Sequence, residues 1–263
     1  MSLPIPEGIE ATDNKCNIKK VNPCGLTSAK NDPLVSIITV IYNGAKTLRA
    51  TIDSIVPQLS EEVEFIVIDG GSTDGTQEII EEYSSHLTYW ISEPDLGIYD
   101  AMNKGISQAN GKFCLFVGSD DEIIPSNFKI ALSLMTEYSC VYYGQVLKNG
   151  MPLGRRTNKF KILRENIPHQ AIFYPKSVYK NNSYRLQYKI CADHEYNIRL
   201  IYSNIKFQYI NLAICKFGSS GVSSLNVDHD FARDYLDIVK TNAGTAVFLI
   251  LRILKLVKRS LVK

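Results

Sequence analysis

Two consecutive segments of this chain follow the same order of an apolar strand, a polar loop and an amphipathic helix. Residues 34–42 (LVSIITVIY) are an apolar run rich in β-branched side chains, and residues 45–56 follow with helical spacing. Residues 63–68 lead into the loop DGGSTDG and then into a helix at residues 76–84. Parallel strands need such helical crossovers, so the pattern predicts an α/β fold with a parallel sheet.

The next strands of this sheet lead to a concentration of acidic side chains. Residues 87–91 predict a third strand, and residues 98–109 predict the helix that follows it. Residues 113–117 predict a fourth, buried strand that ends shortly before Asp120 and Asp121. Open α/β sheets bind ligands at the carboxyl ends of their strands, and oxygen ligands at that edge suit a divalent cation and a phosphate.

The remaining elements alternate less regularly. Helices are expected at residues 126–136, 192–202 and 228–240, and strands at residues 140–144 and 207–212. The composition becomes richer in Arg, Lys, Tyr and Asn after Gly150, which indicates a second half without a flexible linker. We therefore divide the chain into a loose leader (1–32), a first half (33–150), a second half (151–227) and C-terminal helices (228–263).

Charge and cysteine content restrict the class of protein. The net charge of +2 is too balanced to favour nucleic acid as a partner. The six cysteines show no C-x-x-C spacing and predict reduced thiols. The sequence begins without a secretory signal, and no apolar run reaches the roughly 20 residues needed to span a bilayer. We expect a cytoplasmic protein.

Acidic side chains follow three neighbouring strands. Asp69 follows the second strand, Asp95 and Asp100 lie around the loop after the third, and Asp120 and Asp121 follow the fourth. A parallel sheet brings these loops to one crevice, where so many carboxylates repel one another unless a cation or a hydrogen-bonding ligand lies between them. Helix capping is the alternative for single acids, and it is the interpretation we favour for Asp74, whereas two adjacent acids exceed what one cap requires.

Six ordered motifs strengthen this interpretation. They are SIITVIYNG, FIVIDGGSTDGT, SEPDLGIYDAMNKGI, GKFCLFVGSDD, PHQAIFY and CADHEYNIRL. Over roughly residues 34–225 the chain resembles the bacterial family 2 glycosyltransferases that build capsules, lipopolysaccharides and other exopolysaccharides. The resemblance implies a GT-A fold, a nucleotide-diphosphate sugar donor such as a UDP-sugar, Mn²⁺ or Mg²⁺, and inverting transfer of a hexosyl or N-acetylhexosaminyl group.

The resemblance also assigns the donor side of the site. Its residues would be Thr39, Tyr42, Asn43, Asp69, Asp95, Asp100, Asn103, Lys104, Ser119 and Asp120. In the family the loop with Tyr42 and Asn43 borders the base and ribose, and the acid matched by Asp69 holds the uracil or ribose. Asp95 and Asp100 match loop acids near the donor sugar, although Asp100 is equally plausible as a helix-start acid.

The metal ligands follow from the family's Asp-x-Asp element. It corresponds here to Gly118, Ser119 and Asp120, followed by Asp121. Many relatives carry Asp or Asn at the position of Gly118. The ion is therefore expected on Asp120, on Asp121 or on both, where it would offset charge on the departing nucleoside diphosphate.

The second half supplies the acceptor side. Asp193 matches the family's general base at the start of a helix, although a plain N-terminal helix carboxylate is the structural alternative. His169 and Gln170 match a His-Gln pair near the acceptor, while a packing role for this histidine stays open. The expected acceptor is a saccharide or a lipid-linked saccharide.

The C-terminal segment, residues 245–263, reads as a basic amphipathic helix. Arg252, Lys255, Arg259 and Lys263 follow one stripe, and no acid occurs after Asp237. Such a helix lies on an anionic membrane surface, which here would be the inner face of the cytoplasmic membrane. The alternative is a helix packed on the domain or on a partner.

Two other classes of protein compete with a glycosyltransferase. A nucleotidyltransferase acting on sugar phosphates could use the same acidic edge, but it needs a basic, glycine-rich loop that VIYNGAKT does not supply. A non-catalytic nucleotide-sugar-binding subunit is kept open by Gly118. The glycines at 70, 71 and 75 do not form G-x-G-x-x-G, so a dinucleotide site loses support.

Overall fold

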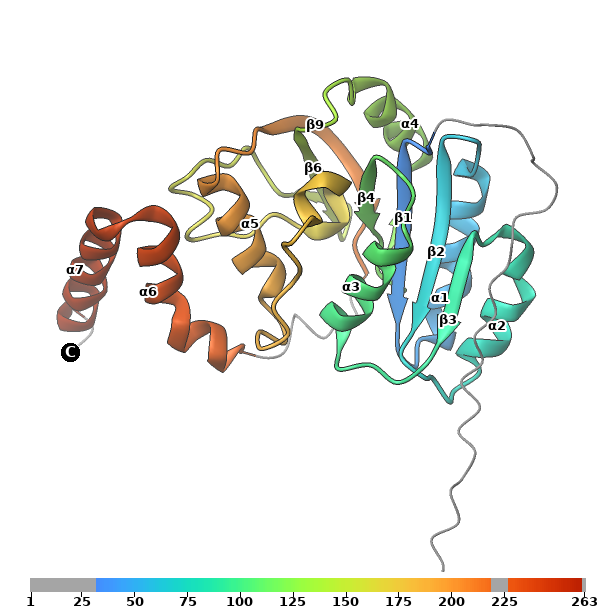
Figure 1. The fold of residues 1–263 in the computed structure, drawn as a ribbon, viewed down its shortest axis with the longest axis horizontal. Coiled ribbons are helices and arrows are strands. Elements are labelled where there is room, and N and C mark those ends of the chain that lie inside the picture. Colours follow the sequence, from blue (N-terminus) through green and yellow to red (C-terminus); the bar gives the residue numbers. More distant parts are fainter. Residues whose placement is uncertain (1–31, 219–226, 262–263) are drawn as a thin grey trace, which may run out of the picture.

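The computed structural model describes residues 32–218 and 227–261 and has a central sheet with helices on both faces (Figure 1). Its first half alternates strands and helices as the sequence predicts: β1 Val35–Ile41, α1 Ala45–Ile55, β2 Val63–Asp69, α2 Thr76–Glu82, β3 Tyr89–Ser92, α3 Ile98–Gln108 and β4 Phe113–Phe116. All residues of β1 and β2 are buried, as expected of strands covered on both faces.

The second half extends this sheet with mixed strand directions. It contains β5 Glu122–Ile123, α4 Pro125–Leu134, β6 Val141–Lys148, β7 Met151–Leu153, β8 Ile172–Pro175, α5 Ala192–Tyr202, β9 Phe207–Lys216, α6 His229–Ala243 and α7 Thr245–Leu261. The order is β3-β2-β1-β4-β8-β6-β9-β5, with β7 on β6. β8 runs antiparallel to both β4 and β6, so the parallel sheet predicted from the sequence is confirmed for β1–β4 but does not continue unchanged.

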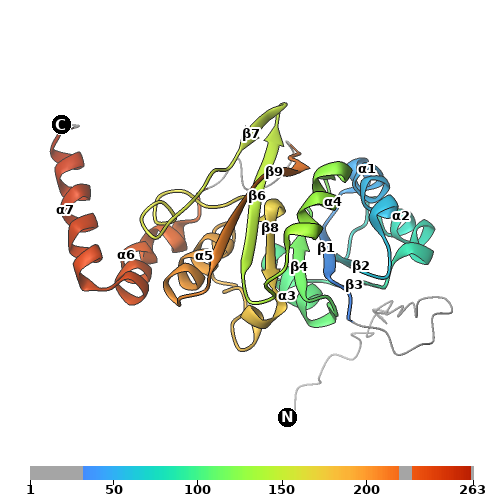
Figure 2. The same ribbon diagram turned by 90° about the horizontal axis from the view of Figure 1, so that it is seen from above.

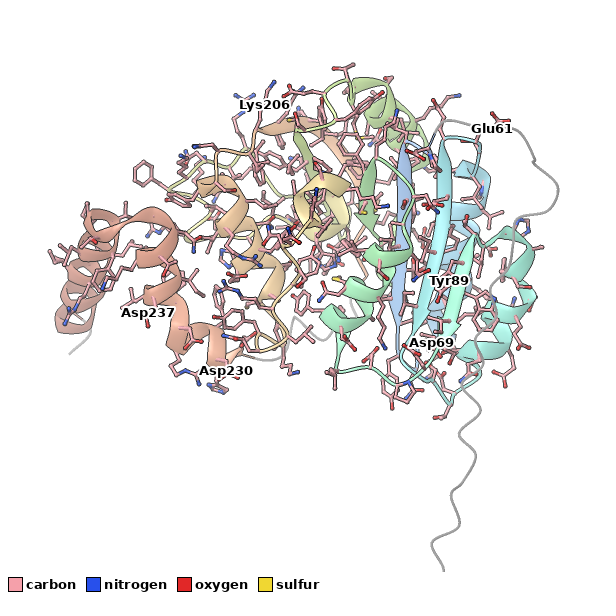
Figure 3. All side chains as sticks on the ribbon, viewed as in Figure 1. Glu61, Asp69, Tyr89, Lys206, Asp230 and Asp237 are labelled. Atoms are coloured by element: carbon pink, nitrogen blue, oxygen red, sulfur yellow. The ribbon has the colours of Figure 1, made fainter. Side chains whose placement is uncertain are left out.

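The register of the parallel strands aligns their carboxyl ends. Ile41 of β1 pairs with Asp69 of β2, and Asp69 pairs with Ser92 of β3. The loops that follow these three strands therefore meet at one edge, where Figure 3 shows Asp69 at the end of its strand. The convergence expected from the sequence is present.

Two apolar cores lie on the two faces of the sheet. On one face α1, α2 and α4 contribute side chains such as Leu48, Ile80 and Phe128. On the other face α3, α5 and α6 contribute residues such as Met102 and Tyr196. Alternate residues of β1 enter opposite cores, so the strand is held from both sides.

The C-terminal helices form a pair at the end of the molecule opposite α1 and α2 (Figure 2). Asp228 caps α6 by accepting a hydrogen bond from the backbone N–H of Phe231 at 3.0 Å. The same carboxylate accepts from the backbone N–H groups of Ile190 and Cys191, at 2.8 and 3.0 Å. Asp228 thus ties the start of α6 to the start of α5. Across the described ranges, no helix is both long enough and apolar enough to cross a bilayer.

Candidate active site

Asp69 organises the loops after β2 and β3. Its side chain is fully buried and accepts hydrogen bonds from the backbone N–H of Ser72 at 3.0 Å and from the Ser92 hydroxyl at 2.5 Å. The Ser72 hydroxyl also donates to this carboxylate. Asp69 therefore holds the two loops together, while its contact with a base or ribose stays a prediction.

Hydrogen bonds connect the loop after β1 to the loop after β2. Asn43 adopts a positive φ of 51°, and its side-chain oxygen accepts from the backbone N–H of Thr73 at 2.9 Å. Asp74 accepts from the backbone N–H groups of Thr76 and Ala45, at 3.2 and 3.1 Å, so it serves the starts of both α2 and α1. The N-cap residue of α2 is Gly75, so Asp74 supports the start of the helix from the position before the cap and is not the cap that the sequence predicted.

Two residues assigned to the donor side, Thr39 of β1 and Tyr42 directly after this strand, differ in their access to solvent. The ring of Tyr42 is 66% exposed at the sheet edge, where a planar ligand can reach it. Thr39 is fully buried within the strand, and its hydroxyl has no hydrogen-bond partner among the described residues.

Acidic side chains accept hydrogen bonds from the backbone of the loop between β3 and α3. Asp95 accepts from the backbone N–H of Gly97 at 2.7 Å, and Asp100 accepts from that of Leu96 at 3.1 Å. Lys104 lies 2.7 Å from Glu93 and 3.7 Å from Asp100, which fixes this loop on α3.

Contacts of two further residues connect this loop to its surroundings. Asn103 exchanges two hydrogen bonds of 3.0 Å with the backbone of Tyr184, which gives it a structural contact. The Asp95 carboxylate lies over Gly70, since a Cβ there would meet Asp95 Oδ2 at 2.6 Å. The acids after β2 and β3 are therefore neighbours in space.

The turn after β4 holds the adjacent acids. Asp121 is 1% exposed, and its two oxygens accept from the backbone N–H groups of Gly118 at 2.9 Å and Gly218 at 2.8 Å. Burial raises the pKa of Asp121, and the charge of Asp120 adds to this effect. A side chain at Gly44 would approach the Ser119 hydroxyl to 3.2 Å, so the turn borders the loop after β1.

Asp193 lies in the first turn of α5 and is 7% exposed. Its Oδ1 lies 2.9 Å from the Tyr99 hydroxyl, and its Oδ2 accepts from the side-chain N–H of Asn166 at 2.8 Å. The Nδ1 atom of His169, from the 3₁₀ turn η3 (His169–Ala171), lies 3.4 Å from Oδ2. Three chain segments therefore converge on this carboxylate.

Electrostatic interactions connect the acceptor-side residues Asp193 and His169 with the acids after β4. Burial opposes ionisation of Asp193, but His169 and Tyr99 outweigh it and lower the pKa of this carboxyl. Burial likewise opposes protonation of His169, but Asp193, followed by Asp121 and Asp120, raises the pKa of the imidazole. The ring thus lies within the field of both the donor-side acids and Asp193.

Sequence reasoning missed Tyr99 and Asn166. Asn166 is part of a chain of hydrogen bonds, because its side-chain oxygen accepts from Asn197 at 2.9 Å and Asn197 accepts from the Tyr174 hydroxyl at 2.8 Å. Tyr99 lies within the motif SEPDLGIYDAMNKGI, in the first turn of α3, and Asn166 stands three residues before His169. These places in the chain are the only signal the sequence offered.

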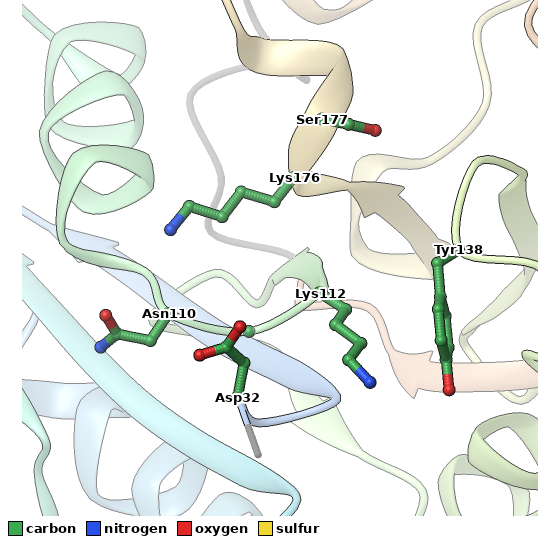
Figure 4. Close-up of a pocket in the computed structure, with 7 residues that line it drawn as sticks. Asp32, Asn110, Lys112, Tyr138, Lys176 and Ser177 are labelled. Carbon is green, nitrogen blue, oxygen red and sulfur yellow. The ribbon is translucent and has the colours of Figure 1, made fainter. Parts of the chain in front are cut away.

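A pocket of about 320 Å³ lies at the opposite, amino-terminal edge of the sheet (Figure 4). Its cations are already engaged: Lys176 donates to the carbonyl of Ala109, and Lys112 lies 4.3 Å from the centre of the Tyr138 ring. It contains none of the residues assigned to the donor or acceptor.

Comparison of folds defines the class of protein. The structure superposes on residues 1–349 of S. aureus TarS in complex with UDP with a TM-score of 0.65 at 21% identity, covering 80% of this chain and 66% of that one. It also matches the mannosyltransferase PcManGT from Pyrobaculum calidifontis in complex with GDP-Man and Mn²⁺, with a TM-score of 0.58 at 13% identity, covering 78% and 61%. The fold is that of the GT-A glycosyltransferases, as the sequence resemblance implied.

Sequence comparison then gives the family. The model of "Glycosyl transferase family 2" matches residues 36–201. A PGL/p-HBAD biosynthesis glycosyltransferase of Mycobacterium bovis is 30% identical over 243 residues, which cover 88% of this chain and 94% of the relative. The putative teichuronic acid biosynthesis glycosyltransferase TuaG of Bacillus subtilis is 33% identical over 132 residues, which cover 47% and 52%. The chain belongs to glycosyl transferase family 2 and is a glycosyltransferase.

Proposed function

We propose that this enzyme transfers a sugar from a UDP-sugar to a hydroxyl of a saccharide or lipid-linked saccharide, with inversion, during synthesis of a surface polysaccharide or glycolipid. The observation that carries the proposal is the 3.4 Å contact between His169 and Asp193, together with the electrostatic effect of Asp121 and Asp120 on the same imidazole. It brings a proton-accepting pair next to an edge suited to a diphosphate. TarS structures with UDP and UDP-GlcNAc, and relatives named for glycolipid and teichuronic acid biosynthesis, support the donor and the pathway class.

The loops after β1, β2 and β4 would bind the donor. Tyr42 offers an exposed ring for the base, and Asn43 and Ser119 lie at the same edge of the sheet. The acceptor hydroxyl would approach from the side of Asp193 and His169, opposite the leaving diphosphate. One in-line displacement then inverts the anomeric centre, with the proton accepted by this pair.

The turn after β4, which contains Asp120 and Asp121, suits a divalent ion that both the protein and the donor phosphates would bind. Asp120 and Asp121 are adjacent; burial raises the pKa of Asp121, and repulsion by Asp120 adds to this effect. We assign Asp120, which matches the last acid of the family's Asp-x-Asp element, as the protein ligand of Mn²⁺ or Mg²⁺, while the two oxygens of Asp121 accept backbone N–H groups of the turn. In the described part of the chain no three acidic, His or Cys side chains form a metal cluster by themselves, which is consistent with phosphate and water completing the coordination. When bound, the ion would neutralise charge on the leaving diphosphate.

A binding panel tests the donor. We expect UDP-sugars, with Mn²⁺ present, to raise the melting temperature more than GDP- or dTDP-sugars, since ligand at 100 times its dissociation constant adds about 2.7 kcal/mol of stability. Product analysis completes the test, because release of UDP identifies sugar transfer, whereas release of pyrophosphate identifies a nucleotidyltransferase. No stabilisation by any nucleotide sugar would contradict the proposed function.

Helix α7 is proposed as the peripheral membrane contact. One side of it packs on α6 through Val247, Phe248 and Leu251. Another side exposes four large apolar residues: Leu249, Ile250, Ile253 and Leu254. The sequence around them is basic, with no acid after Asp237, which complements an anionic lipid surface. Because Asp228 ties α6 to residues 190 and 191, this surface is joined to the Asp193 side of the site, where a lipid-linked acceptor would enter.

We expect Ile250→Ser/Ile253→Ser/Leu254→Ser to stop cosedimentation with vesicles of equal phosphatidylglycerol and phosphatidylcholine, while wild type binds them in a salt-sensitive way. Met151→Ser/Phe160→Ser is the matched control, since these exposed apolar residues lie elsewhere. Deletion of residues 245–263 should move the protein from the membrane to the soluble fraction. Unchanged partitioning would contradict the proposal, and a dimer that dissociates in the triple variant would instead indicate packing on a second copy.

A further inference from the structure

Hydrogen bonds on both oxygens hold the carboxylate of Asp193. Oδ1 accepts from the backbone N–H of His194 at 2.8 Å, and Oδ2 accepts from the side-chain N–H of Asn166 at 2.8 Å. The Tyr99 hydroxyl lies 2.9 Å from Oδ1, but its single proton lies nearer to the carbonyl of Ile190, at 2.6 Å. Asn166 therefore makes the shortest side-chain contact with this carboxylate among the described residues.

A chain of hydrogen bonds determines how the Asn166 amide is oriented. The Tyr174 hydroxyl donates to the side-chain oxygen of Asn197 at 2.8 Å, and the side-chain N–H of Asn197 donates to the oxygen of Asn166 at 2.9 Å. An ionised carboxylate only accepts, so Asn166 has to present its N–H to Asp193 and its oxygen to Asn197. Turning either amide over would bring two oxygens against each other. One arrangement of the chain therefore satisfies all its members.

The chain extends from the interior to the surface. Tyr174 of β8 and Asn197 of α5 are fully buried, whereas Asn166 is exposed. Asn197 follows Asp193 by one helical turn, so the two side chains lie on the same side of α5. Ile167 is 3% exposed and belongs to the core on this face of the sheet, which anchors the backbone next to Asn166. An amide at the surface is thus oriented by groups in the interior.

We propose that Asn166 is a positioning residue for the general base: it holds the plane of the Asp193 carboxylate and favours its ionised form. In the transfer step the acceptor oxygen forms a bond to the anomeric carbon, and the bond from that carbon to the diphosphate oxygen breaks. The electron pair leaves with the nucleoside diphosphate, and the hydroxyl proton moves to Asp193. The inference rests on the proposed sugar transfer with Asp193 as the base.

A double-mutant cycle tests whether Asn166 acts through Asp193. With UDP-sugars as donors and octyl glycosides as acceptors, we expect Asn166→Ala to lower kcat about 10- to 100-fold, because a misdirected base costs rate. Donor-induced thermal stabilisation should stay as in wild type. In the Asp193→Asn background the same substitution should change kcat less than about threefold. Equal losses in both backgrounds would overturn the inference.

The pH dependence of Asn166→Asp gives a readout that a purely structural role would not change. The introduced carboxyl resembles the amide in shape, but it can donate to Asp193 only when it is protonated. Burial opposes ionisation of Asp193, yet His169 and Tyr99 lower its pKa, so a proton shared by the two acids resides on the introduced group. Repulsion by Asp193 raises the pKa of that group.

The ratio of kcat/KM for Asn166→Asp to that for wild type should therefore rise about tenfold or more as the pH decreases from about 8 to 5. His169 of η3, Tyr99 of α3 and His194 of α5 face Asp193 in both proteins, so the ratio removes their titration. A ratio that stays constant over this range would contradict the proposal.

Asn211 provides the matched control. It is an exposed asparagine of β9 whose side-chain oxygen also accepts a hydrogen bond, from the Tyr209 hydroxyl at 3.1 Å. Asn211→Ala should keep the kcat of wild type, and Asn211→Asp should give a ratio that does not change with pH. If wild type releases no UDP from any donor, the proposed function fails instead, so the two failures are distinguishable.

Discussion

Asp193→Asn should abolish most sugar transfer while leaving the donor bound. We expect turnover to fall about 10²- to 10⁴-fold, which is the usual contribution of a general base or of the group that orients it. The amide keeps the size of the side chain but loses the negative charge that faces His169 at 3.4 Å. It also places an NH₂ group beside the donors Tyr99 and Asn166. The expectation follows from the proposed role of Asp193 in accepting the proton, because that role needs its charge.

The measurement combines UDP release in the presence of octyl glycosides with thermal shift in UDP-sugar and Mn²⁺. Donor-induced stabilisation should match wild type, since Asp193 lies on the acceptor side. Asp237→Asn is the matched control, because Asp237 is exposed on α6, far from the acidic edge (Figure 3). Turnover within about threefold of wild type would show that the acceptor proton leaves by another route.

Asp120→Asn should have the second largest effect, on the donor side. We expect turnover to fall about 10²- to 10³-fold and the response to Mn²⁺ to disappear, because the variant lacks the carboxylate proposed to hold the ion. The measurement is the Mn²⁺ dependence of both donor-induced thermal shift and UDP release. An unchanged Mn²⁺ response would remove Asp120 from the metal site.

Asp121→Asn is the informative comparison for this prediction. Asp121 accepts two backbone N–H groups within the protein, and an amide oxygen cannot replace both carboxylate oxygens. We expect a loss of about 1–3 kcal/mol in the free energy of unfolding, measured by urea denaturation. The pair of variants therefore separates a ligand-binding carboxylate from one that holds the turn.

The parallel half of the fold could be predicted because its strands are apolar runs that end at polar loops. Residues of β1 and β2 are buried on both faces, so burial and local sequence agree. The same reasoning placed Asp69, Asp120 and Asp121 at one edge. Position relative to a strand end is local information, and a sequence carries it directly.

The mixed half could not be predicted in the same way. The strand predictions stopped at Gly144 and Leu212, whereas β6 and β9 run on to Lys148 and Lys216. Gly144 marks an irregularity within the strand, because the carbonyl of Leu212 approaches it too closely for any side chain. The four residues of β8 form a strand because β4 and β6 lie on either side. Such pairing depends on contacts distant in sequence.

The surroundings of Asp193 show the same limit within the site. The motif identified the acid, but its hydrogen-bond donors come from α3, from the segment before η3 and from η3 itself. Only the packed structure shows that Tyr99, Asn166 and His169 lie around this carboxylate. Roles within a converged cluster depend on geometry that a motif does not encode.

Glycines 70 and 118 make room for carboxylates that arrive from elsewhere. A Cβ at Gly70 would come within 2.6 Å of Asp95 Oδ2, and one at Gly118 within 2.6 Å of Asp121 Oδ2. An acid introduced at position 118 would therefore compete with Asp121 for one volume instead of adding a second charge. The space available in this turn limits how many carboxylates it can hold. A search for the pattern Asp-x-Asp would therefore overlook this turn, although it carries two acids.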